Sequence, residues 1–305
     1  MMRLGQASIR EVGPRDGLQS WPTPVSTEDK ARIIAAIAAA GVARIEVTSF
    51  VSSRMVPQLA DAEALVARLP RPEGVRYEAL ALSGRGVERA IAAGVHAVVL
   101  VLAASETFNR RNAGRSIDAS LQTFQRLRSA AAEAGVHALA VIGTAFGCPY
   151  EGRVTIGQVQ SIIERFAALG ISEVVLADTT GIAVPPQIED TMRKVIAHWP
   201  DVTFGLHLHN TRGLGLANVC AGLRAGVVQY DTSIGGIGGC PFAPKASGNV
   251  ATEDTLHLLH ELGLKTSIDL DKLIAAAQFA ERILGRELPG QVMKAGPRSR
   301  RSTTW

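Results

Sequence analysis

Short runs of apolar residues alternate along the chain with longer segments in which apolar residues recur every three or four positions. The short runs are rich in Val, Ile, Leu and Ala and predict strands. We expect these strands at residues 8–12, 44–49, 76–82, 97–103, 138–144, 173–178, 203–209 and 229–234. The amphipathic segments predict helices at residues 27–40, 57–68, 84–93, 117–134, 155–169, 186–198 and 213–225.

Start and stop signals of helices support this alternation. Ser26 or Thr27 begins the first predicted helix, and the acidic residues Glu28 and Asp29 follow, as helix N-termini favour. Glycine commonly ends a helix because it adopts a left-handed backbone at no steric cost. Predicted helices end at Gly41, Gly94, Gly135 and Gly170.

Strands that alternate with helices pair in parallel, because a parallel pair needs a long crossover connection. Eight such units predict an α/β fold, a closed (β/α)8 TIM barrel with its active site at the C-terminal ends of the strands. An open doubly wound sheet is the alternative, but it usually carries a Gly-rich dinucleotide fingerprint after its first strand. The turn at 13–17 reads Gly-Pro-Arg-Asp-Gly instead, so the sequence favours the closed barrel.

The length of the chain allows one barrel with an extension. Barrels of this kind run to about 250 residues, and this chain has 305. A helix at 252–262 would close the barrel, so we expect a catalytic domain at 1–265. We expect the remainder, 266–305, to hold a further helix at 270–284 and a basic, flexible tail. The basic residues of that tail are Lys294, Arg298, Arg300 and Arg301.

Composition excludes several classes of partner. Hydrophobic residues make up 47% of the chain and charged residues 20%, which suits a large core and argues against disorder. The net charge of +4 owes much to the tail, and no aromatic-studded basic face accompanies it, so we expect no nucleic-acid partner. The longest apolar runs, such as 97–104, are too short for a membrane span. Three cysteines and no apolar leader predict a cytoplasmic protein without disulfides.

Two histidines lie two residues apart at the end of an apolar run. Side chains alternate between the faces of a strand, so His207 and His209 point the same way. Two neutral imidazoles that converge on one point form half of a metal site. A hydrogen-bonded pair inside a core is the alternative, and the motif alone does not separate the two.

Other polar residues also gather at the ends of the predicted strands. In a (β/α)8 barrel these ends meet at one mouth, so the side chains are predicted to converge there. The residues concerned are Arg15, Asp16, Gln19, Glu46, Thr48, Asp178, Thr179, His207, His209 and Asn210, followed by a glycine-rich loop after the eighth strand.

The order of these motifs resembles the hydroxymethylglutaryl-CoA lyase family of metal-dependent acyl-CoA lyases, whose first strand ends in an Arg-Asp pair. The resemblance rests on residues 12–19, 46–50, 147–152, 207–209, 238–242 and 246–249. By that resemblance Asp16, His207, His209 and Asn249 bind a divalent cation. A carboxylate, imidazoles and an amide oxygen suit Mg²⁺ or Mn²⁺ better than a closed zinc site. Taken alone, Asn249 would be a loop residue bonded to its own backbone.

The resemblance also implies the reaction, a retro-aldol cleavage of a 3-hydroxyacyl-CoA, with a place in leucine degradation and ketone-body formation. Arg15 would hold the enolate or thioester oxygen, or else pair with Glu46 or Asp16. The resemblance favours a part in proton transfer for Glu46 over a purely structural pairing. Cys240 would give a proton to the carbanion, whereas alone it reads as a small buried residue. Asp16 and His207 complete the implied catalytic set.

Several further residues receive more modest predictions. We expect Asp178 and Asp231 to orient the histidines or brace Arg15, and Cys148 and Cys220 to serve packing. Glycines between residues 235 and 239 predict a mobile lid. Arg110 and Arg111 are expected in solvent rather than on CoA phosphates.

Departures from the family pattern lie beside the predicted mouth, at Ser53-Arg54-Met55 and at Asn210-Thr211-Arg212-Gly213-Leu214. Arg212 would meet a second substrate carboxylate or have no role beyond the surface. The substrate predicted first is therefore 3-hydroxy-3-methylglutaryl-CoA, cleaved to acetyl-CoA and acetoacetate. Citramalyl-CoA and longer-chain hydroxyglutaryl-CoA thioesters follow.

Three other functions remain open at this stage, and among the enzymes a 2-oxo acid aldolase is the third choice. A condensing enzyme that joins acetyl-CoA to a 2-oxo acid usually carries a regulatory domain, and only about forty residues follow the predicted barrel. A metal-binding barrel without catalysis would have no use for Arg15, Glu46 and Cys240. We also expect a homo-oligomer, with a dimer favoured; the extra helix at 270–284 would seat the partner or cap the barrel base.

Overall fold

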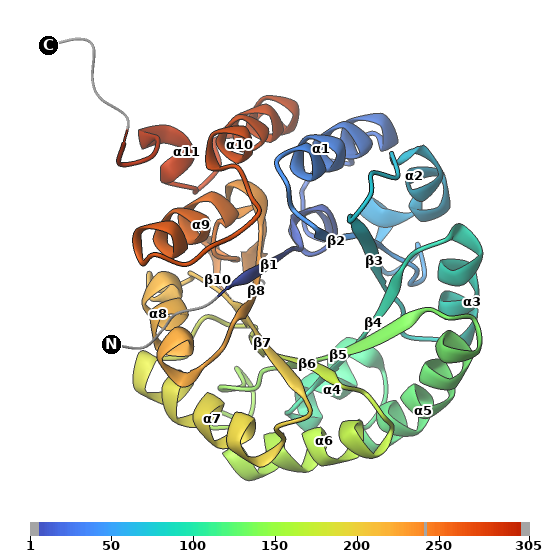
Figure 1. The fold of residues 1–305 in the computed structure, drawn as a ribbon. Coiled ribbons are helices and arrows are strands. Elements are labelled where there is room, and N and C mark those ends of the chain that lie inside the picture. The colour runs from blue at the N-terminus through green and yellow to red at the C-terminus, as the bar shows by residue number, and fades with distance from the viewer. Residues whose placement is uncertain (1–5, 241–242, 300–305) are drawn as a thin grey trace, which may run out of the picture.

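The computed structural model describes residues 6–240 and 243–299 and contains a closed barrel of eight parallel strands inside a ring of helices (Figure 1). Neighbouring strands follow chain order, and β8 pairs with β1 to close the barrel. The predicted (β/α)8 architecture is confirmed. The strands are β1 (Ser8–Glu11), β2 (Arg44–Ser49), β3 (Arg76–Leu80), β4 (Ala97–Ala103), β5 (His137–Gly143), β6 (Glu173–Asp178), β7 (Thr203–Leu208) and β8 (Gln229–Thr232).

The helices between the strands begin and end close to the predicted positions. Ser26 caps the first one by accepting a hydrogen bond from the backbone N–H of Asp29, and Gly94 ends the third in the left-handed conformation. These helices are α1 (Thr27–Ala39), α2 (Ala62–Arg68), α3 (Gly84–Ala93), α5 (Ile117–Glu133), α6 (Ile156–Ala168), α7 (Pro185–His198), α8 (Gly215–Ala225) and α9 (Thr252–Glu261).

Some elements differ from the prediction. The helix expected at 57–68 is interrupted: a 3₁₀ turn, η2 (Pro57–Leu59), precedes α2. Helix α4 (Glu106–Ala113) was not predicted because it is strongly polar and short. A π-helical turn, η1 (Gly13–Gly17), follows β1, and a hairpin of β9 (Gly239–Cys240) and β10 (Ala243–Ser247) follows the 3₁₀ turn η3 (Ile234–Gly236).

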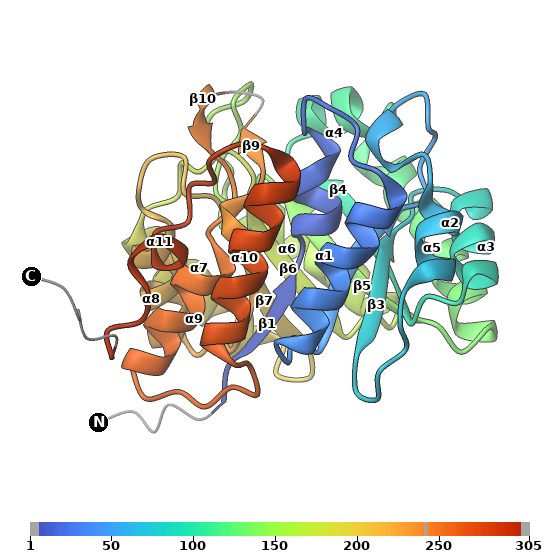
Figure 2. The same ribbon diagram turned by 90° about the horizontal axis from the view of Figure 1, so that it is seen from above.

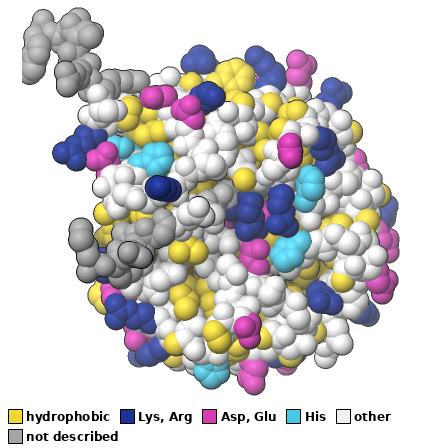
Figure 3. Space-filling view, in the orientation of Figure 1, with side chains coloured by type: hydrophobic (Ala, Val, Ile, Leu, Met, Phe, Trp, Pro, Cys, Tyr) yellow, Lys and Arg dark blue, Asp and Glu magenta, His cyan; other side chains and the backbone are white. Residues whose placement is uncertain are grey.

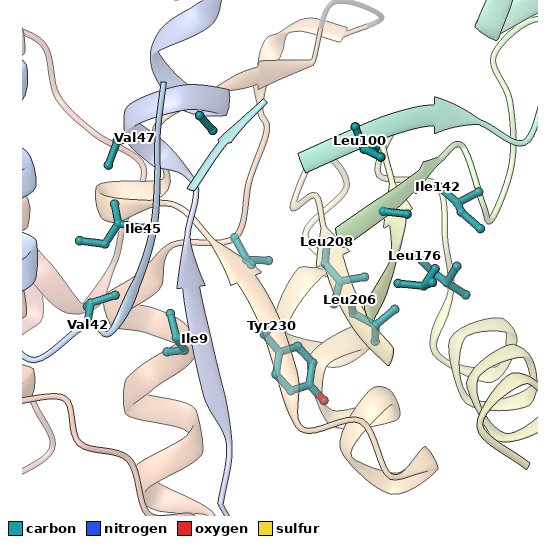
Figure 4. Close-up of a cluster of buried hydrophobic side chains, with 14 of the residues drawn as sticks. Ile9, Val42, Ile45, Val47, Leu100, Ile142, Leu176, Leu206, Leu208 and Tyr230 are labelled. Atoms are coloured by element: carbon teal, nitrogen blue, oxygen red, sulfur yellow. The ribbon is translucent and has the colours of Figure 1, made fainter. Parts of the chain in front are cut away.

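Strand side chains alternate between the helix layer and the barrel interior. Figure 4 shows Ile45 and Val47 of β2 and Leu206 and Leu208 of β7 within the cluster of buried apolar side chains between strands and helices. The residues between them must point to the opposite face. Alternation therefore sends Glu46 and His207 into the barrel.

The barrel interior is divided into an apolar side and a charged side. Strands β3 to β6 contribute an apolar cluster that includes Val99, Val141 and Val175. On the other side Arg10 pairs with Asp231 at 2.5 Å and with Glu78 at 3.4 Å. Buried charges are tolerated only when they are paired in this way.

The ion pairs continue from Glu78 toward the N-terminal end of the barrel. Arg44 binds both Glu78 and Glu173, each at 2.7 Å, and Glu173 also lies 3.3 Å from His137. Figure 3 shows charged side chains of both signs near the centre of this face. The charged side of the interior is therefore one connected network.

The two ends of the barrel differ in what covers them. Figure 2 shows the β9–β10 hairpin and α4 at one end and the start of β1 at the other. The hairpin end is where the strands terminate, so it is the mouth at which barrel enzymes place their active sites. No helix among the described residues has the length and apolar character needed to cross a bilayer.

The C-terminal extension packs on the barrel. Helix α10 (Leu270–Leu284) lies beside α1 (Figure 1), and α11 (Val292–Ala295) buries Met293, which is 1% exposed. Arg298 pairs with Glu261. The expectation of a flexible tail was wrong for this part of the extension, because its apolar residues reach the core; residues 300–305 lie outside the described structure.

Candidate active site and metal centre at the barrel mouth

His207 of β7 and His209, just after the end of β7, meet inside the barrel, as their spacing predicted. The Nε2 atoms of His207 and His209 lie 3.1 Å apart, and the side chains are 7% and 6% exposed. Leu208 between them packs outward against the helices (Figure 4). The strand therefore presents two imidazole nitrogens at one point of the mouth.

Asp16 reaches the same point from the turn after β1. The π-helical turn η1 carries it there, with the backbone N–H of Asp16 bonded to the carbonyl of Val12 at 2.7 Å. Its Oδ2 lies 3.9 Å from His207 Nε2, and one ligand atom from each of Asp16, His207 and His209 lies within 4.8 Å of the others. This is a cluster that can hold a metal ion.

Asn249 comes from the segment after β10. Its Nδ2 donates to Asp16 Oδ2 at 2.9 Å and to the carbonyl of Ile237 at 3.3 Å. Asn249 and His209 also form an isolated β-bridge. Among the described residues, Asn249 Oδ1 and His209 Nδ1 are buried and have no hydrogen-bond partner. A buried acceptor without a partner is costly, so this amide oxygen fits a fourth ligand of a hard cation.

Asp231 of β8 contacts the His207 ring from the neighbouring strand. The register of β7 and β8 places the two residues side by side, and Asp231 Oδ2 lies 3.3 Å from His207 Nδ1. This is the contact that the orienting role predicted for Asp231 requires. Asp231 in turn accepts hydrogen bonds from Nε and Nη2 of Arg10 at 2.8 and 2.5 Å, so it is itself held in place.

The charges around the cluster shift the pKa values of its two histidines in opposite directions. Burial alone would lower the pKa of His207, but Asp231 and Asp16 raise it above its ordinary value. Burial, followed by the charge of His207, lowers the pKa of His209 to about 4. Burial opposes ionisation of Asp16, yet Arg15 and the histidines lower its pKa to about 2. The cluster thus presents a carboxylate and a neutral imidazole at neutral pH, which are the forms that bind metals.

Arg15 lies against the cluster in a fixed orientation. Its Nε and Nη2 donate to the two carboxylate oxygens of Glu46 at 2.9 and 3.0 Å, and its Nη1 donates to Asp16 Oδ1 at 2.7 Å. Glu46 is fully buried and Arg15 is 8% exposed. Both pairings considered for Arg15 are present, and they use both oxygens of Glu46.

The glycine-rich loop after β8 leads from the barrel to Asn249. Gly235, Gly236 and Gly238 have φ values of 60°, 70° and 133°, which residues with a Cβ rarely adopt. A Cβ on Gly238 would lie 2.7 Å from Asn249 Nδ2. Cys240 belongs to β9 of this loop, but its side chain lies outside the described part of the structure, so its predicted role stays a prediction.

The role predicted for Asp178 was wrong, and Arg212 makes contacts that were not predicted. The carboxylate of Asp178 accepts hydrogen bonds from the backbone N–H groups of Ile182 and Ala183 at 3.0 and 3.1 Å. It shapes the loop after β6 rather than bonding to a histidine or to Arg15. Arg212 donates through Nη1 to the carbonyls of Thr180 and Gly181 at 2.9 and 3.0 Å, so this nitrogen braces the same loop.

The remaining predictions concern residues away from the cluster. Cys148 is buried with its Sγ 2.9 Å from Ser105 Oγ, which fits packing, and Cys220 lies half-buried in α8. Arg110 is exposed and pairs with Glu106. Arg111 lies over the ring of Tyr150 at 4.4 Å.

A cavity of about 610 Å³ lies beside the loop that carries Asn249. Gly236, Ile237 and Gly238 line one side of it, and the C-terminal segment lines another with Arg286 and Lys294. This cavity was not predicted from the sequence, because the residues after the predicted helix at 270–284 were expected to form a flexible tail. The basic residues Arg286 and Lys294, which closely follow the predicted final helix, were the signal in the sequence that could have indicated a binding surface there.

Comparison with known proteins places this geometry in a family. The model of the family described as HMGL-like matches residues 6–280. A hydroxymethylglutaryl-CoA lyase of Bacillus subtilis is 41% identical over 286 residues, covering 94% of this chain and 96% of that protein. An (R)-citramalyl-CoA lyase of Chloroflexus aurantiacus is 44% identical over 301 residues, covering 95% of each.

A solved structure agrees with the sequence comparisons. An HMG-CoA lyase from Acinetobacter baumannii, in complex with coenzyme A and 3-methylmalate, superimposes with a TM-score of 0.93 at 37% identity, covering 100% of this chain and 99% of that one. Barrel, mouth cluster and near full-length similarity lead to the same conclusion: the chain belongs to the HMGL-like family.

Proposed function

We propose that the chain is a divalent-metal-dependent carbon–carbon lyase that cleaves 3-hydroxy-3-methylglutaryl-CoA to acetyl-CoA and acetoacetate. The observation that carries this proposal is the cluster of Asp16, His207 and His209 at the barrel mouth, with Arg15 against it. The similarity to a hydroxymethylglutaryl-CoA lyase along nearly the whole chain supports the same activity.

The metal is proposed to be Mg²⁺ or Mn²⁺. Asp16, His207, His209 and Asn249 would hold it through one carboxylate oxygen, two imidazole nitrogens and one amide oxygen, a donor set without thiolates that suits these ions. When bound, the ion would acidify the substrate hydroxyl and polarise the forming ketone.

Arg15 is proposed to stabilise the negative charge that develops on the thioester oxygen. A guanidinium keeps its charge at any working pH and offers donors in a fixed plane. Glu46 occupies two of those donors from inside the barrel, so we assign to Glu46 the orientation of Arg15 in place of a proton transfer. Preorganised charge of this kind needs little rearrangement during the reaction.

The proton transfers are assigned to residues of the cluster and to the loop. Asp16 or His207 takes the proton of the tertiary hydroxyl, the bond between C2 and C3 breaks, and its electron pair forms the enolate of acetyl-CoA. The Cys240 thiol then gives its proton to the enolate carbon and is left as a thiolate to be reprotonated from solvent.

The cavity beside the loop is proposed to receive part of the CoA moiety. It adjoins Gly238, where an added Cβ would meet Asn249 Nδ2, and its wall carries Arg286 and Lys294. Cationic side chains suit the phosphates of CoA, although Glu287 already pairs with Lys294 at 2.6 Å.

A second substrate deserves a direct comparison. The relative from Chloroflexus aurantiacus, which is 44% identical, is named an (R)-citramalyl-CoA lyase. Citramalyl-CoA differs from the first substrate by having its carboxylate directly on the hydroxyl carbon, so its cleavage yields pyruvate in place of acetoacetate.

The test is a product assay on purified, metal-loaded protein. With each thioester supplied in turn, we expect acetoacetate from hydroxymethylglutaryl-CoA at a higher kcat/KM than pyruvate from citramalyl-CoA. A higher kcat/KM for citramalyl-CoA would assign that thioester as the substrate. If neither thioester nor a longer-chain analogue is cleaved, the proposed lyase activity is refuted. Thiol release from acetyl-CoA mixed with 2-oxo acids would point to a condensing enzyme instead.

The cytoplasmic location and the homodimer stay predictions. Sedimentation of the purified protein across a range of concentrations checks the oligomeric state. A dimer seated on α10 would be weakened by charged substitutions on the exposed face of that helix.

A further inference from the structure

A fully buried carboxylate lies at the end of β1, outside the metal cluster. Glu11 is 0% exposed and is the last residue of β1 before the turn that carries Asp16. Burial raises the pKa of Glu11 to about 7. A buried carboxyl group is costly unless its oxygens accept hydrogen bonds, so the identity of its donors is informative.

Three donors from three different segments converge on Glu11. The backbone N–H of Gly13 and that of Ile234 donate to Oε1 at 2.7 and 2.8 Å. The hydroxyl of Thr252 donates to Oε2 at 2.6 Å. One side chain therefore joins the first turn of η1, the first residue of η3 and the start of α9.

Each of the first two segments leads directly to a proposed metal ligand. In η1, the backbone N–H groups of Arg15 and Asp16 bond to the carbonyl of Val12, one residue from Glu11. On the other side, η3 continues to Ile237, whose carbonyl accepts from Asn249 Nδ2 at 3.3 Å. Asp16 and Asn249 are themselves hydrogen-bonded at 2.9 Å.

Gly13 is tightly packed between Glu11 and the loop that holds Ser233. A Cβ added to Gly13 would lie 2.6 Å from Glu11 Oε1 and 2.8 Å from Ser233 Oγ. Ser233 closes the far end of the loop, since its N–H bonds to the carbonyl of Val250 and its carbonyl accepts from Thr252, both at 3.0 Å. The placement of Asn249 is therefore tied to the same point as that of Asp16.

We propose that Glu11 is a positioning residue that holds the Asp16 turn and the Asn249 loop in one arrangement, so that both ligands face the same ion. The proposal rests on the metal centre of the proposed function. It assigns no contact with substrate to Glu11; the carboxylate acts through Gly13 and Ile234.

The test is a direct titration of purified variants with Mn²⁺, followed by the electron paramagnetic resonance signal of the free ion. Glu11→Leu keeps a similar volume but leaves all three donors without an acceptor, and we expect its affinity for Mn²⁺ to fall about tenfold or more, as for other residues that orient metal ligands. Glu11→Gln keeps Oε1 for the two N–H groups and turns its NH₂ toward Thr252 Oγ1, so its affinity is expected to remain within about twofold of wild type.

Glu173→Leu is the matched control. Glu173 is also a largely buried carboxylate with several partners, but these are Arg44, His137 and Gln229 at the opposite end of the barrel. We expect Glu173→Leu to lower the unfolding temperature without changing Mn²⁺ affinity, which separates loss of stability from loss of positioning. All titrations are made well below the unfolding temperature of each variant.

The outcomes are distinguishable. Wild-type affinity in Glu11→Leu, or an equal loss in Glu11→Gln and Glu11→Leu, would overturn the positioning role. If Glu11→Leu does not fold, Glu11→Asp keeps the charge but shortens the side chain by one methylene and draws the carboxylate away from the N–H of Ile234. Unchanged Mn²⁺ affinity in that variant would count against the proposal in the same way. Failure of the wild-type protein to bind Mn²⁺ would instead remove the metal centre, and this inference with it.

Discussion

Nδ1 of His207 lies 3.3 Å from Asp231 Oδ2, and Nε2 of the same ring faces His209 at 3.1 Å. A carboxylate that accepts from one ring nitrogen leaves the lone pair of the other nitrogen for a metal. Asp231→Asn can present an NH₂ group to Nδ1 and so favour the wrong tautomer. We expect this variant to bind Mn²⁺ about 10- to 100-fold more weakly, measured by titration of the free ion.

Glu78→Gln is the control for Asp231→Asn. Glu78 is another fully buried carboxylate paired with Arg10, so both variants remove one negative charge from the same guanidinium. Glu78 bonds to Arg44 rather than to a histidine. Equal losses of Mn²⁺ affinity in the two variants would mean that charge, and not orientation of His207, is what Asp231 supplies.

Arg15→Lys is expected to lower kcat by roughly 10²–10³. A lysine keeps the charge but cannot bind both oxygens of Glu46 and Asp16 at once. Steady-state assays with the thioester give kcat and KM, and the exposed pair of Arg110 and Glu106 offers Arg110→Lys as a control with wild-type kinetics. A kcat unchanged in Arg15→Lys would remove Arg15 from charge stabilisation.

Cys240→Ala is expected to suppress turnover by about 10²-fold or more, because the enolate then lacks its proton donor. Mn²⁺ affinity should stay as in the wild type, since no thiolate belongs to the ligand set. Cys220→Ala, in helix α8, serves as the control with unchanged activity. Full activity in Cys240→Ala would assign the protonation to another group.

Glu253 predicts a pH dependence of stability. Burial raises the pKa of Glu253 to about 8, above the ordinary value of about 4.5, so the folded state binds a proton that the unfolded state releases. Its contribution is complete below pH 4.5 and declines as the pH rises through 8. We expect the free energy of unfolding of the wild type, minus that of Glu253→Gln, to fall by a few kcal/mol from pH 5 to pH 8.

Denaturant unfolding of both proteins at several pH values measures this difference. Glu253→Gln removes the titrating group, and the subtraction cancels groups that titrate identically in the two proteins. A difference that stays constant or rises with pH would show that Glu253 is ionised in the folded protein.

Arg212→Ala separates two roles considered for that residue. Its Nη1 donates to the carbonyls of Thr180 and Gly181, so its loss should cost about 1 kcal/mol of stability while KM for the thioester changes by less than about threefold. Thermal unfolding and steady-state kinetics measure the two effects. A tenfold rise in KM with unchanged stability would assign the guanidinium to the substrate carboxylate.

The barrel was predictable because periodicity and capping agree along most of the chain. Helix α3 and helix α10 were predicted with their observed bounds, and both have glycine in the left-handed conformation at the C-cap. Helix α4 escaped prediction because its residues are mostly polar and its stability comes from caps at Ser105 and Gly114. Turn η1 has no periodic signal, since a π-helical turn of this length is set by its contacts.

The mouth cluster was predictable in part for the same reason. His207 and His209 share a strand face, and alternation alone places them together, whereas the contact of Asp16 with Asn249 joins residues from opposite ends of the barrel sequence. That contact came only from family resemblance. Arg10 and Glu11 were not predicted as functional residues. The available signal was the one that drew attention to Glu46, namely a charged residue within a predicted strand.

The ion pairs of the barrel interior have a further consequence for which ion the site accepts. Among the described residues, the pairs at the barrel centre join three guanidinium groups, of Arg10, Arg15 and Arg44, to five carboxylates, of Asp16, Glu46, Glu78, Glu173 and Asp231. With every carboxylate ionised and His207 neutral, as a metal ligand must be, this set lacks two positive charges for electroneutrality. A dication supplies both, whereas Na⁺ or a trivalent ion leaves the enclosed set unbalanced in a medium that screens charge poorly. We therefore expect the barrel to favour a dication by valence as well as by ligand geometry.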